Sequence, residues 1–403
     1  MIPCRQVVVY YLGMVNSPAY CKHSGVSLYV GAAFKKMAGI IMGLKHSGVN
    51  AQLLSLPFLD NANSPFMVEQ CVLSGDGFRA IYFTTFRNRI YRKFFGSLSL
   101  AWCALTSLSR DDIVLVYNHA PEYFLFLCLL RLKGITVYHD IEDVPISSDN
   151  TIDGFVERLF FRLTFLLSCK RKIVVSRQAA SLLKLRNYLI LNGAFANRTG
   201  FVDDTSSKWT DLLSGGRLCI HYGGTLSTET GLDLFIKALN ILDKSYIGSR
   251  TIAFFVSGIG DIDKVSDVAN CLVNYRINVN VFPKAPLAQY ENILSLCHVS
   301  LSLRSPNAPI SSTTFPSKVI EASSRGLALI TTDVSDMREV YDDQSAFYLT
   351  CFDSRELSNL ISSMASHSES IYSTSRAGRY QVNKRFSPEV VGKSLKSFLR
   401  ISC

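Results

Sequence analysis

Short runs of Val, Ile and Leu alternate along the chain with longer stretches whose apolar positions recur at helical spacing. In the first half this pattern predicts strands at 6–12, 51–56, 113–117, 135–139 and 172–175, and helices at 32–46, 120–132 and 155–168. Continuous apolar strands that alternate with amphipathic helices are typical of βα units and of a parallel sheet covered on both faces. We therefore expect an α/β fold with a Rossmann-like first domain.

The same alternation starts again in the second half of the chain. It predicts strands at 218–222, 251–257, 277–282, 299–303 and 327–331, and helices at 231–242, 262–275, 287–297, 317–325 and 353–365. Between the halves, 197–217 is polar and contains a Gly pair, which predicts a linker. We expect Rossmann-like domains at 1–196 and 218–375 and a C-terminal helix within 376–403 that packs back toward the first domain.

A length of 403 residues agrees with two domains, because one hydrophobic core rarely serves so long a chain. In open parallel sheets ligands bind at the carboxyl ends of the strands. Two such sheets that face each other across a cleft would bind two substrates there, so this architecture favours a transfer reaction.

The net charge of +10 is confined to the first half of the chain. Residues 1–200 hold 22 Lys and Arg against 12 Asp and Glu, whereas residues 201–403 hold 20 of each kind. A basic surface on one domain suits an anionic partner, which could be nucleic acid, a phosphorylated acceptor or an anionic membrane. A basic face that only keeps the protein in solution fits the charge equally well.

The cysteines and the N-terminal residues indicate the cellular compartment in which we expect the protein. The eleven cysteines have irregular spacing and no zinc-binding pattern, so we expect reduced thiols and a cytoplasmic protein. The N-terminal apolar run resembles a first buried strand more than a signal peptide, and no stretch is long enough for a transmembrane helix. Asp261 and Asp263 form a DxD sequence, but we expect Asp261 to cap a helix, and we expect no metal and no cofactor.

The most informative stretch is 315–333. Pro316 and Ser317 precede a predicted helix that starts near Lys318 and ends at Gly326. Backbone amides at a helix start attract an anion, and Lys318 adds a charge beside them. Glu321 lies one turn further on the same face, where it could hold the hydroxyls of a ribose. A capped surface helix with a Lys and Glu pair is the alternative interpretation.

His139 is the last residue of the strand predicted at 135–139, and three acidic residues follow it: Asp140, Glu142 and Asp143. We expect them to project toward the cleft, with His139 as a candidate catalytic group. The three acidic residues would orient His139 or bind the hydroxyls of an acceptor. A histidine that serves only the structure of the strand end remains the alternative.

Several of these stretches together resemble the retaining GT-B glycosyltransferases of family 4, many of which build bacterial lipopolysaccharide, capsule and exopolysaccharide. The resemblance covers nearly the whole chain, and the pattern Pro-Ser-Lys-x-x-Glu is its most specific part. The other matching stretches are 174–176, 191–193, 221–226, 231–239, 255–260 and 385–389.

The resemblance implies that the second domain binds a nucleotide sugar and the first domain binds the acceptor. Glu321 matches the glutamate that holds the ribose, while Ser317 and Lys318 match positions near the diphosphate and the donor sugar. Gly223 and Gly224 would let the backbone approach the phosphates.

In the first domain the resemblance places His139 beside the donor sugar and Gly25 in a glycine-rich loop that approaches the diphosphate. Three positions depart from the family pattern: Thr313 replaces a frequent acidic residue, and Gly224 and Thr230 replace a frequent Arg and Lys. Arg304 is our candidate for the missing positive charge.

Basic and aromatic residues are interleaved at 87–95 and again at 157–172. Such stretches can lie in a membrane interface while their cations meet anionic headgroups. A core-facing helix with a solvated basic side is the alternative. A nucleic-acid partner is not expected, because no recognised binding module is present.

We therefore expect a glycosyltransferase that moves a hexosyl unit from a nucleotide diphosphate sugar to a hydroxyl of a lipid-linked or cell-surface oligosaccharide, with retention of configuration. Helix amides, Lys318 and Arg304 would stabilise the departing diphosphate, which could itself take the acceptor proton. The protein would be cytoplasmic and peripheral at the inner face of the membrane. The alternatives are a hydrolysing nucleotide-sugar epimerase and a non-catalytic partner subunit.

Overall fold

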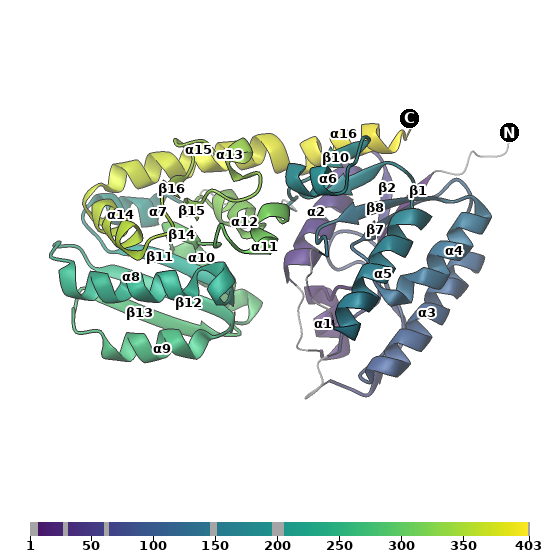
Figure 1. The fold of residues 1–403 in the computed structure, drawn as a ribbon, viewed down its shortest axis with the longest axis horizontal. Coiled ribbons are helices and arrows are strands. Elements are labelled where there is room, and N and C mark those ends of the chain that lie inside the picture. Colours follow the sequence, from purple (N-terminus) through teal and green to yellow (C-terminus); the bar gives the residue numbers. More distant parts are fainter. Residues whose placement is uncertain (1–6, 27–30, 60–63, 146–150, 196–204, 402–403) are drawn as a thin grey trace. The chain divides into compact units, whose positions relative to one another are not determined.

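The structure is a computed structural model that describes residues 7–26, 31–59, 64–145, 151–195 and 205–401. The chain divides into two compact units (Figure 1). Unit 1 comprises Met1–Asn197 and Phe386–Cys403, and unit 2 comprises Arg198–Arg385. Each unit is an α/β domain built around one main parallel sheet, as the alternating pattern predicted.

The sheet of unit 1 has eight strands in the order β10-β9-β8-β7-β1-β2-β5-β4, and only β4 runs antiparallel, to its neighbour β5. A separate antiparallel pair, β3 and β6, lies outside this sheet. The strands are β1 (Val8–Gly13), β2 (Asn50–Ser55), β3 (Met67–Val68), β4 (Cys71–Leu73), β5 (Ala80–Tyr82), β6 (Thr85–Phe86), β7 (Ile113–Tyr117), β8 (Thr136–Ile141), β9 (Lys172–Val174) and β10 (Tyr188–Ile190).

Helices cover both faces of this sheet. On one face α2 (Gly31–His46) packs with α16 (Pro388–Leu399), and on the other α3 (Arg89–Thr106), α4 (Phe124–Lys133) and α5 (Ile152–Leu167) form a layer (Figure 1). The remaining helices are α1 (Pro18–Ser24), the 3-10 turn η1 (Pro121–Tyr123) and α6 (Arg177–Leu182). Successive strand residues point to opposite faces, so Val137 joins the core under α3 and α4 while Tyr138 joins the core under α2.

The last helix, α16, packs against α2 at very short range. A Cβ on Gly392 would lie 1.9 Å from the Gly43 carbonyl oxygen, so glycine is required for the two helices to approach this closely. The Lys396 ammonium donates to the Ser47 carbonyl oxygen at 3.0 Å and fixes the register.

The sheet of unit 2 has six parallel strands in the order β13-β12-β11-β14-β15-β16. They are β11 (Leu218–Leu226), β12 (Ile252–Gly260), β13 (Ile277–Pro283), β14 (Val299–Ser302), β15 (Ala328–Thr332) and β16 (Phe347–Leu349). The helices are α7 (Thr205–Leu213), α8 (Leu232–Ser245), α9 (Ile262–Cys271), α10 (Leu287–Leu296), α11 (Pro309–Thr313), α12 (Lys318–Ser324), α13 (Met337–Val340), α14 (Ser354–Ser366) and α15 (Ser368–Phe386), with a 3-10 turn η2 (Thr228–Thr230).

The segment that we expected to be a linker is partly folded. Residues 205–213 form α7, and Trp209 and Leu212 are buried in the hydrophobic core of unit 2. The Trp209 ring lies 5.2 Å from the rings of both His298 and Tyr372. The prediction missed this helix because only two large apolar side chains anchor an otherwise polar stretch. Residues 197–204 of the expected linker lie outside the described residues, whereas 214–217 are described and connect α7 to β11.

The length and hydropathy of the described helices test whether any of them could cross a membrane. In the part of the chain that the structure describes, no helix combines the length and the apolar character that crossing a bilayer requires.

Candidate functional site

The carboxyl end of β11 is built from two glycines. Gly224 has a φ of 115°, in the left-handed region that favours glycine. A Cβ at this position would lie 1.1 Å from the Lys318 Nζ, so Lys318 occupies the space that any other side chain would need. The Lys318 ammonium donates to the Gly223 carbonyl oxygen at 3.0 Å. The structure therefore brings three of the predicted donor-site residues into direct contact.

The end of the neighbouring strand, β12, also has a glycine where a side chain would not fit. At Gly258, at the end of β12, a Cβ would lie 1.9 Å from the Gly224 carbonyl oxygen. A Cβ on Gly223 would lie 2.5 Å from the His221 Nε2. The backbone at this edge of the sheet is consequently open to a close approach, which is what a phosphate-binding edge of a Rossmann-like sheet requires.

Glu321 lies one turn after Lys318 on α12 and is held by two neighbours. The Tyr290 hydroxyl, on α10, donates to the Glu321 Oε2 at 3.2 Å. The Arg325 Nε lies 3.9 Å from the other carboxylate oxygen, and Arg325 also forms an ion pair with Glu291 at 3.3 Å. These contacts orient the carboxylate, which is partly exposed. Ser317 precedes the helix, and its side chain makes no capping hydrogen bond to it.

His221 lies beneath Lys318 and Glu321 and is buried. Its Nε2 lies 3.0 Å from the Ser257 Oγ, and its ring meets the Tyr290 ring edge-on at 5.8 Å. Burial and, to a smaller extent, Lys318 lower the pKa of His221 to about 4, against an opposing effect of Glu321. The imidazole is thus neutral at physiological pH and adds no charge to the site.

No role for Tyr290 or for the His221 side chain was predicted from the sequence. Tyr290 lies 31 residues before Glu321, and no local pattern links the two positions. Their contact arises because α10 and α12 occupy the same edge of the sheet, which only the tertiary fold establishes.

Arg304 follows β14 and connects to the segment before α12. Its Nη1 donates to the carbonyl oxygen of Thr314 at 3.2 Å and to its hydroxyl at 3.0 Å. Thr313, at the position of a frequent family acid, is buried. The contacts of Arg304 hold the loop that leads to Pro316, so Arg304 supports this loop whether or not it also meets a ligand.

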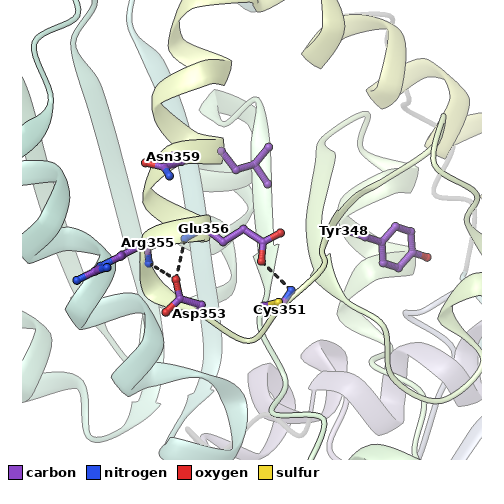
Figure 2. Close-up of a pocket in the computed structure, with 7 residues that line it drawn as sticks. Tyr348, Cys351, Asp353, Arg355, Glu356 and Asn359 are labelled. Carbon is purple, nitrogen blue, oxygen red and sulfur yellow. Dashed lines mark hydrogen bonds between the residues drawn. The ribbon is translucent and has the colours of Figure 1, made fainter.

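An open surface hollow of about 530 Å³ lies at the start of α14 (Figure 2). Asp353 caps α14 by accepting from the backbone amides of Arg355 and Glu356, while the Glu356 carboxylate accepts from Thr350 and Cys351. These polar groups are engaged in ending β16 and starting α14. No predicted site residue lines the hollow, and we assign it no function. Its lining residues are Tyr348, Cys351, Asp353, Arg355, Glu356, Asn359 and Leu360.

In the DxD sequence at the start of α9, Asp261 does not cap the helix with its side chain, contrary to our expectation. It forms an exposed ion pair with Lys264 at 2.7 Å instead. Because Lys264 lies one turn further along the helix, this pair satisfies the carboxylate without a backbone amide.

In unit 1, the polar residues at the end of β8 do not project together, contrary to our expectation. His139 and Asp140 are consecutive on a strand and therefore point to opposite faces of the sheet. His139 is completely buried on the α5 side, 5.8 Å from the Phe161 ring. Burial, with smaller effects of Lys172 and His119, lowers the pKa of His139 well below its ordinary value, so the ring is neutral.

Asp140 faces α2 and belongs to a buried polar cluster. The Lys36 ammonium lies 3.2 Å from the Asp140 Oδ1 and also forms an ion pair with Glu142. The Tyr11 hydroxyl donates to the other Asp140 oxygen. Burial disfavours the charge on Lys36, but Asp140 and Glu142 outweigh it and hold the pKa of Lys36 above its ordinary value.

Glu142 is the member of this cluster whose charge is most finely balanced. Burial raises its pKa, Lys36 lowers it and Asp140 raises it again, to about 7. A carboxyl group that titrates near neutrality can exchange a proton under physiological conditions, which is typical of functional sites. Asp140 and Glu142 were among the residues predicted from the sequence, whereas Lys36 and Tyr11 were not.

The turn after β8 is shaped by Asn118, which adopts a left-handed conformation with φ 53° at the end of β7. Its Oδ1 accepts from the backbone amides of Glu142 and Asp143, and its Nδ2 donates to the Asp143 carboxylate at 2.9 Å. Asp143 is exposed at this edge. Gly25 ends α1 with φ 70°, and a Cβ added there would have no atom within 4 Å. The residues that follow Val26, at 27–30, lie outside the described part.

Comparisons with known proteins identify the fold. No protein-family model matches the sequence, and no curated protein does. Among solved structures, Anabaena Alr3699/HepE in complex with UDP and glucose is similar with a TM-score of 0.64 and 14% identity, over 98% of this chain and 99% of that chain. Sucrose-phosphate synthase from Thermosynechococcus elongatus is similar with a TM-score of 0.63 and 12% identity, over 98% of each chain.

A candidate UDP-N-acetylglucosamine 2-epimerase from Listeria monocytogenes is also similar, with a TM-score of 0.56 and 11% identity over 99% of this chain and 98% of that chain. These similarities define the class of fold, which is the GT-B arrangement of two Rossmann-like domains in one chain. The predicted fold class is confirmed.

Proposed function

We propose that this protein is a glycosyltransferase that uses a nucleotide diphosphate sugar as its donor and binds it at the carboxyl edge of the unit 2 sheet. The observation that carries the proposal is the contact between Lys318 and the Gly223–Gly224 end of β11, with Glu321 one turn away on α12. The UDP complex of the similar Anabaena protein supports it, because that chain shares the fold over its whole length.

Each group in this edge has a chemical task in the proposal. Lys318 neutralises the diphosphate, whose negative charge grows as the bond to the sugar breaks. Glu321, oriented by Tyr290, accepts hydrogen bonds from the ribose hydroxyls. The bare backbone at Gly223 and Gly224 admits the phosphates, and Ser317 and Arg304 contribute to the walls of the site. No metal and no cofactor takes part.

Unit 1 binds the acceptor in this proposal. The exposed Asp143 and the partly exposed Glu142 hold its hydroxyls, and the buried Asp140 and Lys36 orient Glu142 from beneath. The acceptor is a lipid-linked or cell-surface oligosaccharide, and the configuration at the anomeric carbon is retained, as in family 4 enzymes of lipopolysaccharide and capsule synthesis. The departing phosphate takes the acceptor proton. The protein works in the cytoplasm, peripherally at the inner face of the membrane, and binds no nucleic acid.

A hydrolysing nucleotide-sugar epimerase is a second candidate, favoured by one observation. Such an enzyme needs acid and base groups, and Asp140 and Glu142 form a buried pair around Lys36, with the pKa of Glu142 at about 7. The similarity to the Listeria monocytogenes protein fits this alternative. A non-catalytic partner subunit, the third possibility, would account for Thr313 and Thr230.

A product analysis separates these functions. The protein is first screened by thermal shift against a panel of nucleotide sugars that includes UDP-glucose and UDP-N-acetylglucosamine. A ligand at 100 times its dissociation constant stabilises the native state by about 2.7 kcal/mol. The sugar that binds is then supplied with and without a membrane extract as acceptor source.

The proposal predicts nucleotide diphosphate release that depends on the extract, with the sugar recovered on a lipid or oligosaccharide. Release of a free epimerised sugar without extract would establish the epimerase instead. Binding without any turnover would establish the partner subunit, and no binding of any nucleotide sugar would remove the donor site altogether.

A further inference from the structure

The outer face of the α3, α4 and α5 layer is unusually apolar. About half of the large hydrophobic side chains that are exposed in the described residues lie on these three helices. Soluble monomers rarely expose such a concentration, and large exposed patches mark interaction surfaces. We call this surface the α3–α5 face.

The apolar residues of α3 follow one side of the helix. Exposed side chains recur every three or four positions, whereas Leu100, Cys103 and Ala104 turn to the core. The helix α3 therefore has two apolar sides: one packs on the core of unit 1, and the other is exposed. The exposed side chains of this stripe are Ile90, Phe94, Leu98, Trp102 and Leu105.

The neighbouring helices continue the surface. Phe124, Leu125 and Leu132 of α4 are exposed, and α5 exposes Ile152, Phe155, Leu159 and Leu166. The three helices pack side by side on one face of the unit 1 sheet (Figure 1). The Phe124 and Phe160 rings, 6.3 Å apart, join α4 to α5.

The charged residues of α3, α4 and α5 indicate which kind of partner the α3–α5 face binds. The sequences of α3 and α4 contain no acidic residue, while both contain Lys and Arg. On α5, Arg158 and the exposed Arg162 are accompanied by two exposed acidic residues, Asp153 and Glu157, so the three helices together carry seven Lys and Arg against two carboxylates. Arg92, which we had expected among the surface cations, is instead half-buried over the Phe58 ring at 5.3 Å. Arg89 on α3 and Arg131 on α4 are exposed, whereas Lys93, Lys133 and Arg158 are partly buried.

We propose that the α3–α5 face docks the protein onto an anionic lipid membrane, with its aromatic and aliphatic side chains in the interface and its cations against the headgroups. Aromatic and aliphatic residues combined with Lys and Arg suit this interface. A second copy of the chain fits less well, because a symmetric contact would place two positively charged faces with few carboxylates against each other. This inference does not depend on the proposed reaction, because the donor residues lie in unit 2.

The two tryptophans provide a direct test. Trp102 lies on the α3–α5 face and is 69% exposed, whereas Trp209 is 3% exposed in the core of unit 2. The full-length protein is mixed with phosphatidylglycerol vesicles and, separately, with phosphatidylcholine vesicles. We expect a blue shift of the emission, and quenching by brominated acyl chains, with phosphatidylglycerol only. Trp102→Phe should abolish both signals but keep sedimentation with the vesicles.

Matched variants test the face itself. Replacing Phe94, Leu98 and Trp102 by Ser should weaken sedimentation with phosphatidylglycerol vesicles at least about tenfold. The same number of exposed apolar residues is removed from unit 2 by Ile247→Ser, Val273→Ser and Tyr275→Ser, and this control should bind within about twofold of wild type. Because all six side chains are exposed, both variants should keep the wild-type melting temperature.

Charge reversal supplies the second pair of variants. Arg89→Glu with Arg162→Glu should weaken vesicle binding and its dependence on salt, whereas Lys237→Glu with Lys244→Glu, exposed on α8, should not. Equal binding to neutral and anionic vesicles, or equal losses in the test and control variants, would overturn the proposal. So would a wild-type dimer that the Ser variant dissociates while neither protein binds vesicles.

Discussion

Gly224 is the residue at which the candidate donor site tolerates change least. Its backbone is left-handed, and the Lys318 ammonium occupies the place of a Cβ. Two separate costs therefore attach to any substitution there: the strain of the conformation and the displacement of the cation.

Gly224→Ala should displace Lys318 and abolish most nucleotide binding. Conformational strain alone should lower the free energy of unfolding by about 1 kcal/mol, and the contact with Lys318 adds to it. Gly215→Ala is the matched control, because Gly215 has a similar φ of 102° with no atom within 4 Å of an added Cβ. The measurements are urea unfolding and calorimetric titration with UDP. Equal stability losses and unchanged binding in both variants would show that Lys318 does not depend on Gly224.

Between elements, the buried cluster around Lys36 connects α2 to the end of β8. Breaking a buried ion pair from one side costs about 3 to 5 kcal/mol, because it leaves uncompensated charge. Here Lys36 compensates both Asp140 and Glu142, so its removal leaves two carboxylates without their cation.

Lys36→Met should therefore lower the free energy of unfolding by about 3 kcal/mol or more, measured by scanning calorimetry and urea unfolding. Adding Glu142→Gln should restore part of the loss, because one buried charge then disappears. Lys35→Met, at the adjacent and less buried position, serves as the control. If Lys36→Met is no less stable than Lys35→Met, the cluster does not hold these elements together.

At the same scale, the sequence predicted the two main sheets well. All ten expected strands are present within a few residues, because strands buried on both faces are continuous apolar runs. The end of β11 was missed, since Gly223 and Gly224 are turn residues by composition and join the strand only through pairing with β12. The strands β3 to β6, β10 and β16 were not predicted, because each is only two or three residues long and too short to show a periodic pattern.

The part of the candidate site that could be predicted from the sequence consists of residues that lie close together along the chain. Lys318 and Glu321 share one helix turn, and their helical spacing was visible in the sequence. The partners Tyr290, Lys36 and Tyr11 are distant in sequence and meet the site only through packing. The opposite orientations of His139 and Asp140 followed from the period of a strand, but only once the strand was known to continue to Ile141.

For the molecule as a whole, buried histidines make stability depend on pH. In unit 2, His298 accepts from the Cys219 amide through Nδ1 at 3.0 Å, and its Nε2 lies 3.1 Å from the Lys208 carbonyl oxygen, an arrangement that a neutral ring satisfies. Burial lowers the pKa of His298 to about 4, from 6.5 in the unfolded chain. Between these values only the unfolded chain binds the proton, so stability present above pH 6.5 is lost as the pH falls toward 4.

His298→Gln should be less stable at pH 7 but less sensitive to acid. From pH 7 to pH 5 the wild type should lose about 2 kcal/mol more of its unfolding free energy than the variant. Trp209, 5.2 Å from the His298 ring, reports this transition in a Trp102→Phe background. An equal loss in both proteins would mean that His298 is protonated in the folded state or is not protected from solvent.

The central claim, that unit 2 binds a nucleotide diphosphate sugar through Glu321 and Lys318, is tested most directly by calorimetric titration with UDP. Glu321→Gln removes the charged hydrogen-bond acceptor but leaves a side chain of similar shape beside Tyr290 and Arg325. The control is Glu291→Gln, which removes the other carboxylate that pairs with Arg325. A hydrogen bond to a charged group contributes about 1.5 to 3 kcal/mol, so Glu321→Gln should bind UDP at least about tenfold more weakly. Glu291→Gln should stay within about threefold of wild type. Unchanged affinity in folded Glu321→Gln, or equal losses in the two variants, would contradict the account.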